Sequence, residues 1–189
     1  MIHRSRRPRP NPTPPSNPAP APSPLALVPL LAVLVLACGA DPGPAASLQE
    51  GDPAPAFQLA SLDGRKLGPQ DFAGQVVLVE FWATWCPPCH HQADILKPLY
   101  PEYRRQGVEF LAVGLGEDEE TVRDWVDGHP FPYPVLIDPE DELTYRLGIL
   151  ALPTLLVIDR AGDVAYFSPG VLEEDELREV LARAGAETT

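Results

Sequence analysis

Two cysteines with two residues between them, Cys86 and Cys89, are the side chains of this sequence best suited to carry out chemistry. They follow an apolar and aromatic run, 76–82, that is typical of a buried strand, and a helix is expected to begin at Cys86. A pair with this spacing closes a small disulfide. A thiolate at the start of a helix is stabilised by the unpaired N–H groups there. The pattern therefore predicts a pair that alternates between dithiol and disulfide.

The two cysteines are expected to have different roles. Cys86 is the candidate nucleophile, because the helix N-terminus favours its thiolate and solvent access is greatest there. Cys89 lies one turn further in and is the candidate resolving thiol, which attacks the mixed disulfide and releases the substrate. A permanent structural disulfide is the alternative, but a disulfide in a turn flanked by aromatic residues would not crosslink distant parts of the fold.

The same residues also match the pattern for covalent attachment of c-type haem, because His90 directly follows Cys89. A haem- or copper-handling binding module is therefore an alternative from a different functional class. The strand-like run before the motif and the two prolines within it argue against haem. His90 and His91 are expected either to face solvent or to tune the pKa of the Cys86 thiol.

Glu80 is a carboxylate inside the otherwise apolar run 76–82. Burying an ionised carboxylate is costly, so this side chain is expected to be neutral or hydrogen-bonded. The alternative is a residue that faces outward from an edge strand.

Residues 1–50 are expected to precede the folded domain. We interpret residues 1–37 as a signal peptide with a basic, proline-rich start and an apolar core. Cys38 follows a small residue where the apolar core ends, and it is the candidate lipidation site. Residues 38–50 are then a lipid-anchored flexible tether, and residues 51–189 the domain. The alternative is a cut further along, with Cys38 as part of the apolar core.

Composition limits the classes of partner. The net charge of −13 excludes a nucleic-acid partner, because phosphate would be repelled. Two acidic runs, 117–120 and 173–176, stand where helices are expected to begin, and acidic side chains stabilise a helix N-terminus. We therefore interpret these runs as helix caps and solvated faces rather than binding sites.

Strands and helices are expected to alternate along the domain, which predicts a layered α/β fold. The first two strands flank Asp63-Gly64, a hairpin signal. Strands are expected at 56–59, 66–67, 76–82, 108–115, 134–137, 154–158 and 164–168, and helices at 86–106, 119–127, 141–147 and 173–184.

The segment Gly51–Ala184 resembles the membrane-tethered, TlpA/ResA-like branch of the thioredoxin superfamily. The resemblance implies a thioredoxin-like fold, with a central mixed β-sheet flanked by helices, an N-terminal β-hairpin and a βα insertion. The features that carry it are the Trp-Cys-Pro-Pro-Cys run at 85–89, the opening Gly51–Phe57, Trp125 and Tyr133 in the insertion, and Leu152-Pro153-Thr154.

The resemblance also implies roles for single residues. Glu80 matches the buried acid of thioredoxins, which implies a proton acceptor for Cys89. Pro153 matches the cis-proline beside the cysteine pair, which would aim the Leu152 backbone at an incoming peptide and keep metal off the thiols. Gln92 stands where this branch often has a glutamate, so acidic tuning of the pair is expected from Glu80 alone. The residues expected to bind substrate are Trp85, Pro87, Pro88, Leu152 and Thr154.

Together these features predict a thiol–disulfide oxidoreductase, without cofactor or metal, in the periplasm or cell envelope as a membrane-anchored lipoprotein. By resemblance it would reduce disulfides in exported proteins, with apocytochrome c as one candidate client. Its electrons would come from a membrane thiol reductant of the DsbD/CcdA kind. The alternative enzyme is a thiol peroxidase, since peroxiredoxins share the opening residues, but their Pro-x-x-x-Thr-x-x-Cys setting is absent.

Overall fold

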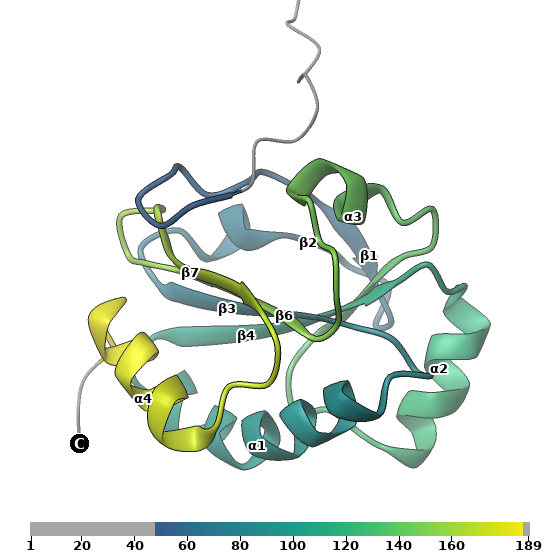
Figure 1. The fold of residues 1–189 in the computed structure, drawn as a ribbon. Helices are drawn as coiled ribbons and strands as arrows, with labels where there is room; N and C mark the ends of the chain where they lie inside the picture. Colours follow the sequence, from purple (N-terminus) through teal and green to yellow (C-terminus); the bar gives the residue numbers. More distant parts are fainter. Residues whose placement is uncertain (1–47, 187–189) are drawn as a thin grey trace, which may run out of the picture. The chain divides into compact units, whose positions relative to one another are not determined.

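A mixed sheet of seven strands runs through the part of the chain that the computed structural model describes, residues 48–186 (Figure 1). The strand order is β2-β1-β5-β4-β3-β6-β7. β4 pairs in parallel with β3 and β5, whereas β6 is antiparallel to both β3 and β7. The strands are β1 (Leu59–Ser61), β2 (Lys66–Leu67), β3 (Val76–Trp82), β4 (Val108–Leu115), β5 (Val135–Asp138), β6 (Thr154–Ile158) and β7 (Val164–Pro169).

The sheet is covered on both faces. On one face lie α1 (Pro87–Arg104), α4 (Glu174–Arg183) and α2 (Glu119–Gly128), which are seen below the sheet and to its right in Figure 1. On the other lie α3 (Glu142–Leu147) and the short 3₁₀ helix η1 (Pro69–Phe72). Each face has its own apolar core.

β3 and β4 are buried along their whole length, because both faces of the sheet are covered at its centre. Side chains alternate between the faces along a strand. In β3, Val76, Leu78 and Trp82 belong to the core under α1, and Val77 and Val79 to the opposite one. Glu80 therefore points to the face that α1 covers.

The strands and helices expected from the sequence are confirmed to within two residues, apart from the first strand. β1 begins at Leu59 and not at residue 56, because its register with β2 starts at the pair Leu59↔Leu67 and the tight turn at Gly64 fixes that pairing. The same strand also pairs with β5 through Ala60 and Ile137.

The acidic run 117–120, at the start of α2, makes two kinds of contact. Asp118 caps α2 by accepting a hydrogen bond from the Thr121 N–H at 2.8 Å, and the glutamates that follow it lie in the first helical turn, as expected. Glu117 does not cap the helix, because its carboxylate is bonded to the loop that precedes the cysteine pair.

The expected signal peptide, the tether and the lipidation site Cys38 lie outside the residues that the structure describes. Within residues 48–186, no helix is both long enough and apolar enough to cross a bilayer.

Candidate active site

Cys86 and Cys89 form a disulfide at the first turn of α1, with their Cα atoms 5.3 Å apart. Cys86 is the N-cap residue of the helix, and Pro87 and Pro88 occupy the first helical positions, where the missing N–H groups cost nothing. The backbone N–H of Cys89 points at Sγ of Cys86, 3.3 Å away. An N–H donor and the helix dipole thus act on the Cys86 sulfur, which favours its thiolate after reduction.

Both cysteines are covered in this oxidised form. Cys86 is 3% exposed and Cys89 1% exposed, so the expected difference in solvent access between the two is small while Sγ of Cys86 is bonded to Sγ of Cys89. The exposed surface around the pair belongs to Trp85 and to the two prolines of the motif.

Glu80 lies fully buried in the central strand β3, so the edge-strand alternative is wrong. Neither of its carboxyl oxygens has a hydrogen-bond partner among the described residues. Burial raises the pKa of Glu80 to about 8, and the positive charge of Lys97 opposes that rise. The side chain is therefore mostly protonated at neutral pH and ionises within reach of physiological conditions.

The loop beside the disulfide contains a cis peptide bond between Leu152 and Pro153, as the resemblance implied. Thr154 is buried, and its hydroxyl donates to the Ala151 carbonyl at 2.7 Å, so this side chain is engaged within the loop.

A groove of about 400 Å³ runs next to this loop. Its walls include Trp85, Leu150 and Leu152, and Asp141 is the charged residue among those that line it. Trp85 is 69% exposed and Leu150 is 95% exposed. Large apolar side chains left in water at the edge of a groove are typical of a surface that receives another molecule.

The loop before the pair is held by the segment between β4 and α2, through a contact that the sequence pattern did not predict. The Glu117 carboxylate accepts from the Thr84 N–H at 2.7 Å and from the Thr84 hydroxyl. The carbonyl of Thr84 in turn pairs with Nε2 of His90 at 2.8 Å. The available signal was an acidic residue two positions after the end of β4, the strand that neighbours β3.

The two histidines have different environments. His91 faces solvent beside Glu173, whereas His90 is half-buried and its ring stacks on Trp125 with centroids 4.8 Å apart. Within residues 48–186, no three His, Cys, Asp or Glu side chains are grouped so that they could hold a metal ion.

Gln92 is fully buried and tied to the chain that leads into α4. Its Oε1 accepts from the Leu172 N–H at 2.7 Å, and its Nε2 donates to the Leu172 carbonyl at 3.3 Å. The Gln92 amide thus pairs with one backbone donor and one backbone acceptor. An ionised carboxylate at this position could not pair with the acceptor, because it has no proton to donate.

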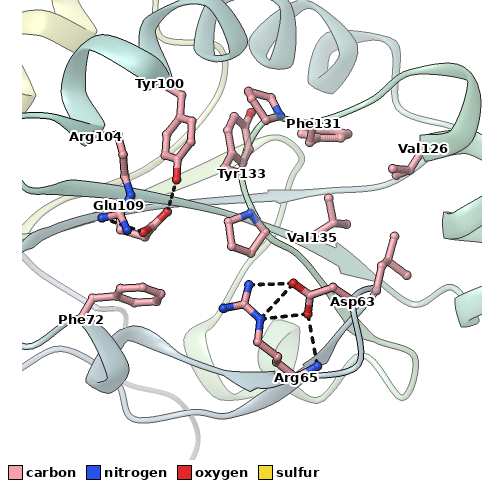
Figure 2. Close-up of a pocket in the computed structure, with 13 residues that line it drawn as sticks. Asp63, Arg65, Phe72, Tyr100, Arg104, Glu109, Val126, Phe131, Tyr133 and Val135 are labelled. Atoms are coloured by element: carbon pink, nitrogen blue, oxygen red, sulfur yellow. Dashed lines mark hydrogen bonds and ion pairs between the residues drawn. The ribbon is translucent and has the colours of Figure 1, made fainter.

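A second cavity of about 450 Å³ lies away from the motif, among the start of β5, the later turns of α1 and the hairpin of β1 and β2 (Figure 2). The charges in its wall are paired. Glu109 accepts from the Tyr100 hydroxyl at 2.7 Å and lies 3.2 Å from Arg104, and Arg65 is bonded to Asp63. The aromatic ring of Tyr133 completes this wall.

Residues 49–182 match the protein-family model described as Redoxin. The chain is 35% identical over 131 residues to thiol-disulfide oxidoreductase ResA of Geobacillus thermodenitrificans, a match that covers 69% of this chain and 75% of the relative. It is 34% identical over 136 residues to ResA of Bacillus thuringiensis subsp. konkukian, covering 72% of this chain and 79% of the relative.

The fold is similar to a crystal structure assigned to thiol:disulfide interchange protein DsbE of Chlorobium tepidum. The TM-score is 0.68 and the identity 30%, and the match covers 74% of this chain and 100% of that chain. The similarity confirms the thioredoxin-like α/β fold. The names of these relatives, which are thiol-disulfide oxidoreductases, favour disulfide exchange over the thiol peroxidase and over the haem- or copper-handling alternatives.

Proposed function

Because the chain belongs to the Redoxin family and is a thiol–disulfide oxidoreductase of the ResA/DsbE kind, we propose that it reduces disulfides in exported proteins. The observation that carries the proposal is the Cys86–Cys89 disulfide at the first turn of α1, in a chain similar to ResA over most of its length. Apocytochrome c, the client that the resemblance implies, is the first to test.

The reaction is a double exchange in which the reduced protein gives two electrons to the client. The Cys86 thiolate attacks one sulfur of the client disulfide, a Cys86–client disulfide forms, and the first client thiolate leaves. Cys89 then loses its proton and attacks Sγ of Cys86. The Cys86–Cys89 bond forms and the second client thiolate leaves. A membrane thiol reductant of the DsbD/CcdA kind would restore the dithiol.

Glu80 is the group that we assign as proton acceptor for Cys89. It lies on the sheet face that α1 covers, and the first turn of α1 carries Cys89. Only the ionised carboxylate accepts a proton, and the pKa of about 8 places its ionisation between pH 7 and 9. The resolving step is therefore expected to accelerate with pH in this range, and Glu80→Gln to slow it and remove the acceleration.

The client is expected to bind at the rim of the disulfide. Trp85, Pro87 and Pro88 supply exposed surface on one side, and the Leu152–Pro153 loop lies on the other. An apolar side chain of the client, close to its disulfide, would fill the groove of about 400 Å³. The occupant that we propose is therefore an extended client segment whose cysteine is flanked by an apolar residue.

We further propose that the enzyme works outside the cytoplasm, attached to a membrane through lipid on Cys38. The support is the basic start and the apolar core of residues 1–37, which end directly before this cysteine. Incorporation of labelled fatty acid into the wild-type chain, and none into Cys38→Ala, is the expected result. Equal incorporation into both would contradict the anchor.

The reduction potential of the Cys86–Cys89 pair tests the proposed direction of electron flow. It is measured by equilibrating the protein with defined thiol buffers and counting free thiols. A value near or below about −220 mV, in the range of thioredoxin and the glutaredoxins, supports a reductant. A value near about −120 mV would indicate an enzyme that introduces disulfides, and the reductive proposal would fall.

A further inference from the structure

Buried polar atoms without a hydrogen-bond partner lie on the sheet face that α1 covers. Among residues 48–186 they include both carboxyl oxygens of Glu80, Nε1 of Trp82 and the hydroxyl of Tyr133. These three residues are 0%, 1% and 4% exposed, respectively. Buried polar atoms nearly always have a partner, and ordered water serves where protein atoms do not. The three side chains therefore indicate a hydrated site inside this face.

The strand register aligns Glu80 with the chain around Tyr133. Glu80 stands opposite Ala112 of β4, and Ala112 stands opposite Val135 of β5. Tyr133 comes two residues before Val135 and lies in the same apolar core as Ala112. Because the side chain of Ala112 is only a methyl group, it takes up little space between the side chains of Glu80 and Tyr133. The two long side chains can approach each other above it.

Lys97 of α1 is the cation that acts on this site. Its ammonium lies 4.5 Å from the ring centre of Phe131 and 5.8 Å from that of Trp125. Phe131 in turn packs against Tyr133, with centroids 5.4 Å apart, and against Trp82, at 5.2 Å. Lys97 thus lies against the aromatic residues that surround the unpartnered atoms.

The charges of these groups also act on one another. The positive charge of Lys97 lowers the pKa of Glu80, and the charge of Glu80 raises that of Tyr133. In the disulfide form, where Cys86 and Cys89 do not titrate, Lys97 is the one charged side chain among the described residues that acts on the pKa of Glu80.

On its other side, Tyr133 borders the second cavity. Figure 2 shows its ring between Tyr100 and Phe131 in the cavity wall, and the ring centroids are 5.3 and 5.4 Å apart, respectively. At the disulfide end both cysteines are covered, and the groove beside them is the proposed client site. Tyr133 therefore has a buried hydroxyl on which the Glu80 charge acts, and it is also one of the residues that line the second cavity.

We propose that Tyr133 and Lys97 are positioning residues for Glu80, and that water held by the Tyr133 hydroxyl carries the Glu80 proton out toward the second cavity. Glu80 takes the proton from the Cys89 thiol and passes it to this water, which releases a proton to solvent, so that the carboxylate is restored. Lys97 stabilises the ionised carboxylate during this exchange. The inference rests on the proposed role of Glu80.

The first test is Tyr133→Phe, which removes only the hydroxyl. Reduced protein is mixed rapidly with dithiobis-nitrobenzoate, and the second, concentration-independent release of nitrothiobenzoate reports the attack by Cys89. We expect this phase to slow about tenfold at pH 8, with a larger solvent isotope effect and an unchanged reduction potential. The free energy of unfolding should change little, because the hydroxyl has no hydrogen-bond partner among the described residues.

The matched control is Tyr100→Phe, because its ring belongs to the same aromatic group but its hydroxyl is bonded to Glu109. This variant is expected to lose stability and to keep the wild-type rate of the second phase. A wild-type rate in Tyr133→Phe, together with a slow Glu80→Gln, would overturn the water route and leave the proposed function intact. A wild-type rate in Glu80→Gln would instead remove the proposed proton acceptor.

The second test follows the ionisation of Glu80 directly, through the infrared carboxyl band that Glu80→Gln lacks. Lys97→Met is expected to move the midpoint of this titration up by about one pH unit, and Lys97→Arg to keep it near the wild-type value. The pH dependence of the resolving step should shift by the same amount. A midpoint that is equal in all three proteins would show that Lys97 does not act on Glu80.

Discussion

The carboxyl group of Glu80 has no exposed surface and, within residues 48–186, no hydrogen-bond partner, so its ionisation opposes folding. Burial raises the pKa of Glu80 from its ordinary value of 4.5 to about 8 in the folded protein. Between these pH values the folded chain holds a proton that the unfolded chain has lost. This residue's contribution therefore makes the free energy of unfolding fall as pH rises from about 5 to 8, and level off above the folded pKa.

Glu80→Leu is accordingly expected to stabilise the protein while it impairs disulfide exchange. At pH 7 the free energy of unfolding should rise by roughly 2–3 kcal/mol, because the variant has no carboxyl to keep protonated or to bury ionised. Urea unfolding of the oxidised proteins at pH 5 and pH 8 measures it. The difference between the variant and wild type should grow with pH, and a constant difference would contradict the raised pKa.

Leu150 is a large apolar side chain left almost entirely in water at the edge of the groove beside the cis-proline loop. If the client fills this groove, Leu150→Ser removes apolar contact area that exists only in the complex. We expect KM for a client peptide with a leucine beside its cysteine to rise about fivefold, with kcat little changed. Steady-state reduction of the peptide disulfide provides the measurement.

Tyr145→Ser is the control for this substitution, because Tyr145 is 77% exposed but does not line the groove. Its KM is expected to match that of wild type. If the two variants raise KM equally, general surface hydrophobicity and not the groove would account for the effect.

The elements around the pair show which features a sequence pattern can predict. The strand run 76–82, the start of α1 and the place of Glu80 on the face under that helix follow from residues close together in the chain. The contacts of Glu117 with Thr84 and of Gln92 with Leu172 join segments 33 and 80 residues apart. Such contacts depend on tertiary packing, which local hydrophobic pattern and propensity do not encode.

The first turns of α1 are fastened to the chain before α4 through the Gln92 amide. In Gln92→Glu, the acid that the related branch often has, a carboxylate still accepts from the Leu172 N–H but faces the Leu172 carbonyl without a proton to donate. We expect the free energy of unfolding to fall by about 2 kcal/mol at pH 7. Denaturant unfolding checks this value.

The deficit of Gln92→Glu should shrink at low pH, because a buried carboxyl with a raised pKa regains its proton there and donates again. Gln75→Glu is the matched control. Its side-chain oxygen accepts from Arg104 at 3.3 Å, a contact that a carboxylate preserves. A deficit that is equal at pH 5 and pH 7 would mean that the loss comes from packing and not from the missing donor.

At the scale of the whole domain, one arginine donates hydrogen bonds to three segments that lie far apart in the sequence. Arg160, in the turn between β6 and β7, donates to the carbonyls of Gly185 at 3.0 Å, Gly74 at 3.2 Å and Gln106 at 2.9 Å. These carbonyls lie just past α4, just before β3 and just before β4. The contacts therefore gather at the starts of the central strands, whereas the disulfide follows the end of β3.

Arg160→Ala is expected to separate stability from activity, because the arginine supports the ends of the elements opposite the cysteine pair. Losing three partly solvated hydrogen bonds should lower the free energy of unfolding by about 2 kcal/mol. The rates of both phases of disulfide exchange should stay unchanged at 25 °C. Arg105→Ala is the control for charge, since Arg105 is exposed beside Gln106 at the same end of α1. If Arg160→Ala also slowed the resolving step, the two ends of the sheet would be coupled, and the site around Glu80 could not be treated as a rigid unit.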